Sequence, residues 1–292
     1  MVKVKFFGTA RVLLKDKEMD GDFKNIKDMI DAICEKYGVT QKDMKQYYVY
    51  VNEVNISTLK KYKTELKDGD VVYLLSPASG GWYMSLLKKK TVLVVGCGGL
   101  GGYVIQQLGR MDLGTLIILD GDVFEKSNLN RQLLCTKSNL GISKAQVYAD
   151  FLNDITDAKV ISYFAKLDES NADLINKADV VIDCVDSVKT RLFLAEQCKK
   201  RGKILIHAGV DGECGQAFIC CPDKNTMQDF YGESEEVPHK TISFNVGLAA
   251  SLETMLAYRV LTNDDEEYKG KIIIFDLPSG LIRVMNLWEN SV

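Results

Sequence analysis

A glycine-rich turn between a short apolar segment and a helical segment constrains the fold of this chain more than any other feature. The apolar segment TVLVV, residues 91–95, leads directly into GCGGLG, residues 96–101, and GYVIQQLGRM follows with helical character. In such a GxGxxG turn the glycines let the backbone approach phosphate groups, and the helix N-terminus favours negative charge. The sequence therefore predicts a nucleotide-binding α/β fold, against the alternative of tight strand–helix packing without a ligand.

Strand and helix patterns alternate after this turn. Strands are predicted at residues 115–120, 158–164, 178–184, 203–208, 216–221, 271–276 and 280–286, and helices at residues 143–153, 187–201 and 246–261. This alternation predicts a Rossmann-like, mainly parallel sheet with helices on both faces. Residues 222–243 have little periodicity and are predicted to form a mobile loop.

The first eighty residues have a different pattern. Strands are predicted at residues 2–7 and 47–51 and within KDGDVVYLLSPASGG, residues 67–81, with a helix at 25–37 and a hairpin partner strand at 11–14. One helix among several strands indicates a small α+β domain. We therefore expect a first domain over residues 1–81, a linker over residues 82–90 and a nucleotide-binding domain over residues 91–292.

Composition excludes several classes of protein. The 292 residues include 37 basic and 40 acidic side chains, a net charge of −3, which argues against a nucleic-acid-binding surface. No apolar run approaches the roughly 20 residues that span a membrane, and the charged N-terminal segment does not resemble a signal peptide, so we expect a cytoplasmic protein. The eight cysteines form no CxxC pair, so no zinc site is expected.

Polar residues after the second and fourth strands indicate a triphosphate site. Asp120 ends the second strand, where a carboxylate can accept hydrogen bonds from ribose hydroxyls, which fits NAD as well as ATP. Arg131 and Lys144 follow and could bind phosphate oxygens. Asp186 follows the strand at residues 178–184, where its carboxylate could hold Mg²⁺, or alternatively cap the helix that starts at Ser187.

Residues 91–288 resemble the MoeB/ThiF/HesA family, relatives of ubiquitin-activating enzymes. The similar segments are VLVVGCGGLGGY, ILDGDVFEKSNLNRQ, GISKAQ, DVVIDCVDS with Arg191, and GLAASLETMLAYRVL. The resemblance implies a homodimeric enzyme that uses ATP and Mg²⁺ to adenylate the C-terminal glycine of a ubiquitin-like sulfur-carrier protein. It implies catalytic roles for Arg131, Lys144 and Asp186, with Asp186 at the metal. The cofactor-binding residues that it implies are Gly96, Gly98, Gly99, Gly101, Asp120, Asp122, Asn128, Arg131, Gln132, Lys144 and Ser187.

Residues 1–81 resemble MoaD, a ubiquitin-like (β-grasp) sulfur carrier of molybdenum-cofactor assembly. The likeness lies in VKVKFFGTARVL and in DGDVVYLLSPASGG, which ends in Gly80 and Gly81, and Pro77 favours MoaD over the thiamine carrier ThiS. The alternative is an ordinary glycine turn that leads into a linker. The resemblance implies a role in molybdenum- or tungsten-cofactor assembly together with a sulfur donor protein.

The predicted carrier tail has no free carboxylate in this chain, because Trp82 follows Gly81. An amide carbonyl cannot attack ATP as a carboxylate does. Three interpretations remain: cleavage after Gly81 frees the tail, the enzyme serves a separate carrier, or the first domain is a permanently blocked docking module. The first is favoured slightly over the second.

Two further departures from the family concern catalysis. No cysteine follows Cys221, although many relatives carry a catalytic cysteine in that region, so we expect an enzyme that stops at the acyl-adenylate. Relatives have an arginine-containing helix before the first strand, which reaches the partner's ATP, but the short segment WYMSLLKKK, residues 82–90, contains no arginine. Lys88, Lys89 or Lys90 are candidates to replace that arginine, against the alternative of a solvated edge.

Other functions remain as alternatives to adenylation of a molybdenum-type carrier. They are adenylation of another peptide C-terminus, such as a thiamine-type carrier, and a nucleotide-binding scaffold without turnover. An NAD oxidoreductase is the weakest, because no acid or base stands at a hydride site. Of the two histidines, His207 is interpreted as strand-end packing and His239 as loop surface.

Overall fold

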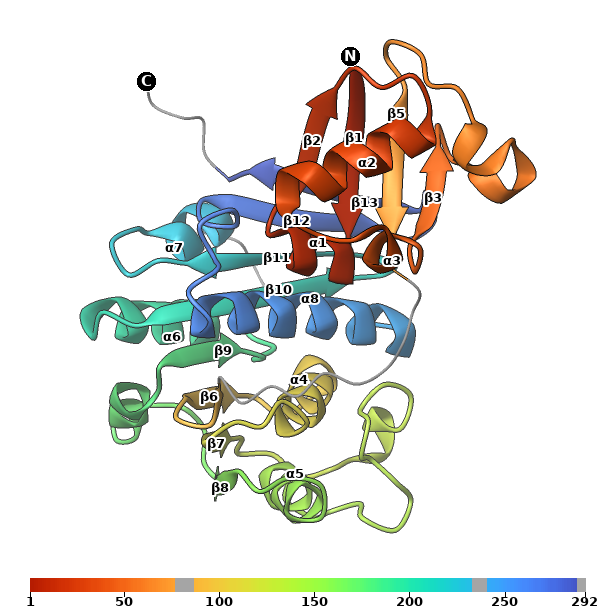
Figure 1. Ribbon diagram of the computed structural model, residues 1–292. Coiled ribbons are helices and arrows are strands. Elements are labelled where there is room, and N and C mark those ends of the chain that lie inside the picture. The colour runs from red at the N-terminus through yellow and green to blue at the C-terminus, as the bar shows by residue number, and fades with distance from the viewer. Residues whose placement is uncertain (77–86, 233–240, 288–292) are drawn as a thin grey trace. The chain divides into compact units, whose positions relative to one another are not determined.

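The computed structural model describes residues 1–76, 87–232 and 241–287 (Figure 1). The chain divides into two compact units, Met1–Trp82 and Tyr83–Val292, and each has a hydrophobic core of its own. The diglycine Gly80-Gly81, the first part of the predicted linker and His239 lie outside the described residues.

The N-terminal unit is a mixed sheet with one long helix on it. Its strands are β1 (Val2–Phe7), β2 (Glu18–Gly21), β3 (Tyr48–Val51), β4 (Val54–Asn55) and β5 (Val71–Leu75), in the order β2-β1-β5-β3-β4, with β1 and β5 parallel. Helix α2 (Ile26–Tyr37) is capped by Asn25, whose side chain accepts a hydrogen bond from the Asp28 amide. Its apolar residues at helical spacing (Ile26, Met29, Ile30 and Ile33) are buried. The predicted ubiquitin-like α+β fold is confirmed.

The hairpin strand predicted at residues 11–14 is wrong. These residues belong to helix α1 (Thr9–Leu14), and the strand that pairs with β1 is β2. Ala10 and Leu14 are both buried, and their spacing of four places them on one face of a helix. The short α3 (Gln41–Met44) and the 3₁₀ turns η1 (Ile56–Thr58) and η2 (Lys61–Lys63) complete this unit.

The second unit is built on an eight-stranded sheet in the order β13-β12-β11-β10-β9-β6-β7-β8. Its parallel half contains β6 (Thr91–Val95), β7 (Thr115–Leu119), β8 (Lys159–Tyr163), β9 (Val180–Asp183) and β10 (Ile204–Asp211). The remaining strands, β11 (Cys214–Cys220), β12 (Lys271–Asp276) and β13 (Leu281–Asn286), are antiparallel. The prediction of a mainly parallel sheet is confirmed, with an antiparallel extension that it did not contain.

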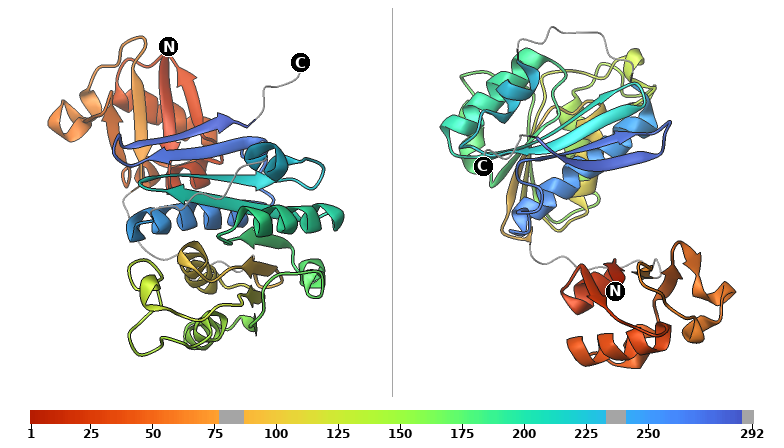
Figure 2. Two further views of the ribbon diagram at one scale, coloured as in Figure 1. Left: turned by 180° about the vertical axis from the view of Figure 1, so that it is seen from behind. Right: turned by 90° about the horizontal axis from the view of Figure 1, so that it is seen from above.

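Helices cover both faces of this sheet because its strands are apolar on both sides. In β6, Val92 and Val94 pack into one core cluster and Leu93 and Val95 into the other. The first cluster includes residues of α4 (Gly99–Gly109), α5 (Lys144–Asn153) and α8 (Ser243–Leu261). The second includes residues of η5 (Ala172–Lys177), α6 (Val188–Lys200) and α7 (Thr226–Tyr231). Figure 2 shows α6 (green) and α8 (blue) on opposite faces.

The strand order reverses at β6. The strand next in sequence, β7, lies on one side of β6, and β9 lies on the other. In open α/β sheets ligands bind at such a switch point, outside the carboxyl ends of the strands. The turn of residues 96–101 follows β6 and the segment of residues 184–187 follows β9, so the chain brings two candidate segments to this point.

Candidate nucleotide-binding site

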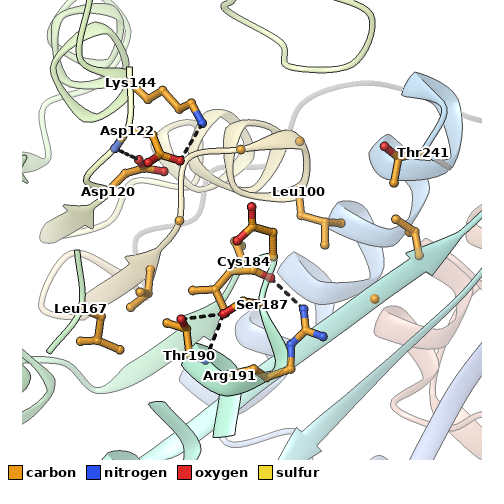
Figure 3. A pocket seen from close by; sticks show the side chains of 18 of the residues that line it. Leu100, Asp120, Asp122, Lys144, Leu167, Cys184, Ser187, Thr190, Arg191 and Thr241 are labelled. Atoms are coloured by element: carbon orange, nitrogen blue, oxygen red, sulfur yellow. Dashed lines mark hydrogen bonds and ion pairs between the residues drawn. The ribbon is translucent and has the colours of Figure 1, made fainter. Parts of the chain in front are cut away.

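A cavity of about 900 Å³ lies at the carboxyl ends of the parallel strands and spans the switch point. Figure 3 shows Asp120, Asp122 and Lys144 on one side of it and Ser187, Thr190 and Arg191 on the other. The predicted site residues that line it are Gly96, Gly98, Gly99, Asp120, Asp122, Arg131, Gln132, Lys144, Asp186 and Ser187. Two others, Gly101 and Asn128, lie outside its lining.

The glycines of the turn serve two different purposes. Gly96 has a φ of +99°, and a Cβ there would lie 2.4 Å from the Cys184 carbonyl oxygen. A Cβ on Gly101 would lie 1.8 Å from the Gly96 carbonyl oxygen, so close packing requires both glycines. At Gly98, by contrast, the nearest atom to such a Cβ is Nε2 of Gln132 at 3.8 Å. The space over Gly98 therefore stays open at the N-terminus of α4, where a phosphate would bind.

The Asp120 carboxylate is hydrogen-bonded to the glycine-rich turn of residues 96–101. Its Oδ2 accepts a hydrogen bond from the Cys97 amide at 2.5 Å, and its Oδ1 accepts one from the Asp122 amide at 2.7 Å. Burial raises the pKa of Asp120, against the effect of these two hydrogen bonds. Each carboxylate oxygen keeps a further acceptor site, which a ribose hydroxyl could use.

The cationic side chains of the cavity differ in their partners. The Nζ atoms of Lys144 and Lys166 lie 3.4 and 3.9 Å from the carboxylate of Asp122. The Arg131 guanidinium donates only to neutral groups, the Ser127 carbonyl oxygen at 3.0 Å and the Asn130 side-chain oxygen at 2.9 Å. Within the described residues Arg131 has no carboxylate partner, so its charge is available for a phosphate.

Asp186 is exposed, and in the part of the chain that the structure describes its carboxylate has no hydrogen-bond or ion-pair partner. The alternative in which Asp186 caps a helix is wrong, because Ser187 caps α6: the Ser187 Oγ accepts a hydrogen bond from the Thr190 amide at 3.1 Å. Carboxylate oxygens are the ligands that Mg²⁺ prefers. The exposed carboxylate of Asp186 in the cavity lining therefore has the chemistry of a ligand that could hold a magnesium ion.

Of the two polar residues predicted in the SNLNRQ segment besides Arg131, Asn128 lies outside the cavity lining and Gln132 lies within it. The Oδ1 atom of Asn128 accepts a hydrogen bond from the Glu125 amide at 3.0 Å and closes the short 3₁₀ turn η4 (Lys126–Asn128). It therefore shapes the loop that carries Arg131. Gln132 lines the cavity, and its Oε1 is buried without a hydrogen-bond partner among the residues that the structure describes. A buried amide oxygen without a partner is costly, so it marks a place where a ligand donor would be stabilised.

Sequence reasoning did not assign a role to Arg191, Gln216 or Tyr231, which also line the cavity. Arg191 lies one turn after Ser187 on α6, and its signals in the sequence were this spacing and its place after the DVVIDCVDS motif of the family resemblance. Tyr231 belongs to α7, within residues 222–243. The prediction of a loop there is wrong for Thr226–Tyr231, where the buried Thr226 and Met227 pack the helix against the sheet.

A buried hydrogen-bond network supports the side of the cavity that Arg191 and Tyr231 line. Oδ2 of Asp183 lies 3.0 Å from the Arg191 Nε and 2.8 Å from the His207 Nδ1. Although burial acts to raise the pKa of Asp183, the Arg191 charge and the His207 hydrogen bond outweigh it and lower that pKa. His207 is 0% exposed, which confirms that it is a packing residue, although it lies in the middle of β10 and not at a strand end. Burial lowers its pKa, so the ring is neutral.

The lysines considered as replacements for a missing arginine do not line the cavity. Residues 88–90 precede β6 and so lie at the amino-terminal edge of the parallel strands. The Lys88 Nζ lies 3.6 Å from the Asp112 carboxylate. Within this chain they therefore cannot reach the ligand site.

Cys184 is the one cysteine in the lining of this cavity as far as the chain is described. Its Sγ lies 3.6 Å from Oε2 of Glu253, and burial raises the pKa of the Cys184 thiol well above its ordinary value. A thiol in such an environment is a poor nucleophile. Within the described ranges no three His, Cys, Asp or Glu side chains form a metal-binding group, and no helix is long and apolar enough to cross a membrane.

Comparison with known proteins assigns both units to families. The sequence profile of the ThiF family matches residues 75–291, and that of the ThiS family matches residues 4–81. The chain is 31% identical to the SAMP-activating enzyme E1 of Haloferax volcanii over 199 residues, which cover 65% of this chain and 74% of that protein. It is also 31% identical to the adenylyltransferase and sulfurtransferase MOCS3 of Xenopus laevis over 209 residues, 68% of this chain and 46% of MOCS3.

Solved structures share the fold of the second unit. The crystal structure of E. coli MccB with ATP matches with a TM-score of 0.60 at 20% identity, over 72% of this chain and 66% of MccB. The crystal structure of PaaA matches with a TM-score of 0.59 at 22% identity, over 70% of this chain and 66% of PaaA. The chain spans about half the length of the MOCS3 relatives, so similarity to them covers their shared domain only. The matched profile over residues 75–291 and the relatedness to an activating enzyme show that this chain belongs to the ThiF family.

Proposed function

We propose that this chain is an ATP-dependent adenylyltransferase that activates the C-terminal glycine of a ubiquitin-like sulfur carrier. Its relatives are named as an activating enzyme and as adenylyltransferases, and its own N-terminal unit matches the ThiS family. We further propose a carrier of the MoaD type, and thus a role in molybdenum- or tungsten-cofactor assembly, on the basis of Pro77 before the diglycine. The proposed enzyme works as a homodimer in the cytoplasm, and a separate donor protein supplies the sulfur.

One observation carries the proposal: two charges that have no ion-pair partner within residues 1–76, 87–232 and 241–287 flank an open phosphate cradle. The cradle is the space over Gly98, the cation is Arg131, and the anion is Asp186. A triphosphate needs a fixed cation for its oxygens and a carboxylate that can hold its metal ion. A dinucleotide has a pyrophosphate in place of a triphosphate and needs no metal, so ATP explains the free carboxylate of Asp186 better than NAD does.

The chemistry requires little covalent participation from the protein. A carboxylate oxygen of the carrier attacks the α-phosphorus of ATP, a P–O bond to the leaving group breaks, and pyrophosphate departs with the electron pair. Arg131 and Lys144 offset the negative charge on the phosphates, and Asp120 orients the ribose. Asp186 would hold Mg²⁺, which supplies additional charge neutralisation when bound. Positioning of the two reactants therefore dominates catalysis.

Pyrophosphate exchange tests the proposal directly. The full chain should incorporate labelled pyrophosphate into ATP when residues 1–81 with a free Gly81 carboxylate are added. Residues 1–81 can be used as a separate protein because the N-terminal unit has its own core and should fold alone. Residues 1–82, which end in Trp82, serve as the matched control and should support no exchange. If neither residues 1–81 nor any diglycine carrier from the same cell supports exchange, the enzyme proposal fails and a nucleotide-binding scaffold is favoured.

The source of the carrier follows from a second measurement. An intact mass near 32.6 kDa for the protein from its native cell means that Gly81 stays blocked and that a separate carrier is the substrate. Two fragments that divide after Gly81 mean that the chain supplies its own carrier.

The reaction should end at the acyl-adenylate. No cysteine follows Cys221, and Cys184 has a raised pKa and a partner in Glu253. After incubation with ATP, Mg²⁺ and residues 1–81, a non-reducing gel should show no adduct that dithiothreitol removes. A reducible band at the summed mass of enzyme and carrier would contradict this prediction, and the cysteine responsible would then be sought by substitution.

A further inference from the structure

Arg191 is held in place at the cavity wall from three directions. Its Nε donates to Oδ2 of Asp183 at 3.0 Å, and its NH2 group donates to the Val185 carbonyl oxygen at 2.7 Å. The Tyr231 ring covers the guanidinium, with 4.9 Å between the ring centroid and the central carbon. These two hydrogen bonds and a side-chain hydrogen bond to Tyr231 use three of the five N–H donors of a guanidinium, so a fixed fork retains two donors for a ligand.

Tyr231 is itself fixed by buried groups. The oxygen of Tyr231 lies 2.8 Å from the His207 Nε2, and the His207 Nδ1 lies 2.8 Å from Oδ2 of Asp183. Because Asp183 can only accept, the neutral His207 ring donates from Nδ1 and accepts from Tyr231 at Nε2. The same carboxylate thus anchors Arg191 directly and the ring over Arg191 through His207. An arrangement of this kind holds a side chain in one orientation before a ligand binds.

The cluster of Arg191, Tyr231, His207 and Asp183 lies several strands away from the proposed nucleotide position. Asp120 follows β7, whereas Arg191 and Tyr231 adjoin β9 and β10, and β6 lies between. Three strand spacings of about 4.8 Å separate β7 from β10, roughly 14 Å in all. The cavity of about 900 Å³ is near the upper end of the range for small-molecule sites, which leaves room for a second reactant beyond the phosphates.

We propose that Arg191 binds the C-terminal carboxylate of the acyl substrate and that Tyr231 is the positioning residue that keeps its guanidinium in place. The inference rests on the proposed adenylyltransferase function and adds to it the group that receives the nucleophile. A planar guanidinium matches the two oxygens of a carboxylate, and its fixed orientation holds them for attack on the α-phosphorus. Lysine would retain the charge opposite Asp183 but not the fork.

The test compares Michaelis constants for the two substrates in pyrophosphate exchange. R191K should raise the KM for residues 1–81 about tenfold or more and leave the KM for ATP within about twofold, because only the carboxylate loses its paired contacts. Y231F keeps the ring but loses the bond to His207, and should raise the same KM about threefold. R201K is the matched control: Arg201 pairs with Asp173 at the end of α6, outside the cavity, and neither KM should change.

Thermal unfolding of each variant separates a positioning role from a structural one. The buried Asp183 keeps a cation in R191K, so its melting temperature should stay close to that of the wild type. Equal KM values for residues 1–81 in the wild type and R191K would overturn the inference, as would a rise confined to the KM for ATP, which would place Arg191 at a phosphate. Absence of exchange in the wild type would instead overturn the proposed function, and the inference with it.

Discussion

Replacing Asp186 with alanine should lower the rate of pyrophosphate exchange about 1000-fold while the protein remains folded. The carboxylate is exposed and unpartnered among the described residues, so its removal costs no internal contact. The proposed reaction loses the group that would hold Mg²⁺ against the phosphates, and repulsion between their charges then opposes attack. Initial exchange rates over a range of Mg²⁺ concentrations measure the effect, and the melting temperature reports on the fold.

A matched substitution controls for general loss of surface charge. Asp157 is exposed and does not line the cavity, so Asp157→Ala should leave the exchange rate unchanged. If Asp186→Ala retained the wild-type rate and Mg²⁺ dependence, the metal would have to bind elsewhere. In that case the unpaired carboxylate would no longer support a triphosphate over a dinucleotide.

Alanine substitutions at two glycines of the same turn should affect two different properties, stability at Gly101 and ATP affinity at Gly98. Gly101→Ala should lower the free energy of unfolding by about 3 kcal/mol or more, because its Cβ would meet the Gly96 carbonyl oxygen at 1.8 Å and force a backbone shift. Gly98→Ala should leave stability nearly unchanged, since its Cβ meets nothing closer than 3.8 Å. The same methyl group would occupy the proposed phosphate cradle, and ATP affinity should fall at least about tenfold.

Each glycine variant serves as the control for the other. Denaturant unfolding and titration calorimetry with ATP measure the two effects on the same samples. Unchanged ATP affinity in Gly98→Ala would move the phosphates away from the N-terminus of α4. An unchanged unfolding free energy in Gly101→Ala would show that the turn can relax around a side chain.

The sequence predicted those parts of the site that follow directly from strand and turn patterns. The turn of residues 96–101, Asp120 at the end of β7 and Asp186 after β9 all stand at strand ends, and strand ends in a parallel sheet meet at one edge. Tyr231 and Gln216 reach the same cavity from α7 and β11, and no spacing in the sequence relates them to the turn. Only the packing of α7 against the sheet places Tyr231 over Arg191.

The errors in secondary structure have the same origin. Residues 11–14 were predicted as a strand because apolar residues follow one another there. In the structure Ala10 and Leu14 lie on the buried face of helix α1. The segment of residues 222–243 lacks periodicity because α7 is short and its buried residues, Thr226 and Met227, are adjacent. In both places the contact with the sheet decides the conformation and local propensity does not.

The sequence by itself determined the fold class, the family and the glycine-rich turn, because each depends on residues that are neighbours along the chain. Tertiary structure alone decided which charges are available: it paired Lys144 with Asp122 and Arg191 with Asp183, and it left Arg131 without a carboxylate partner in the described ranges. The physical reason is that the availability of a charge depends on distances between side chains that are far apart in sequence, and folding alone sets those distances.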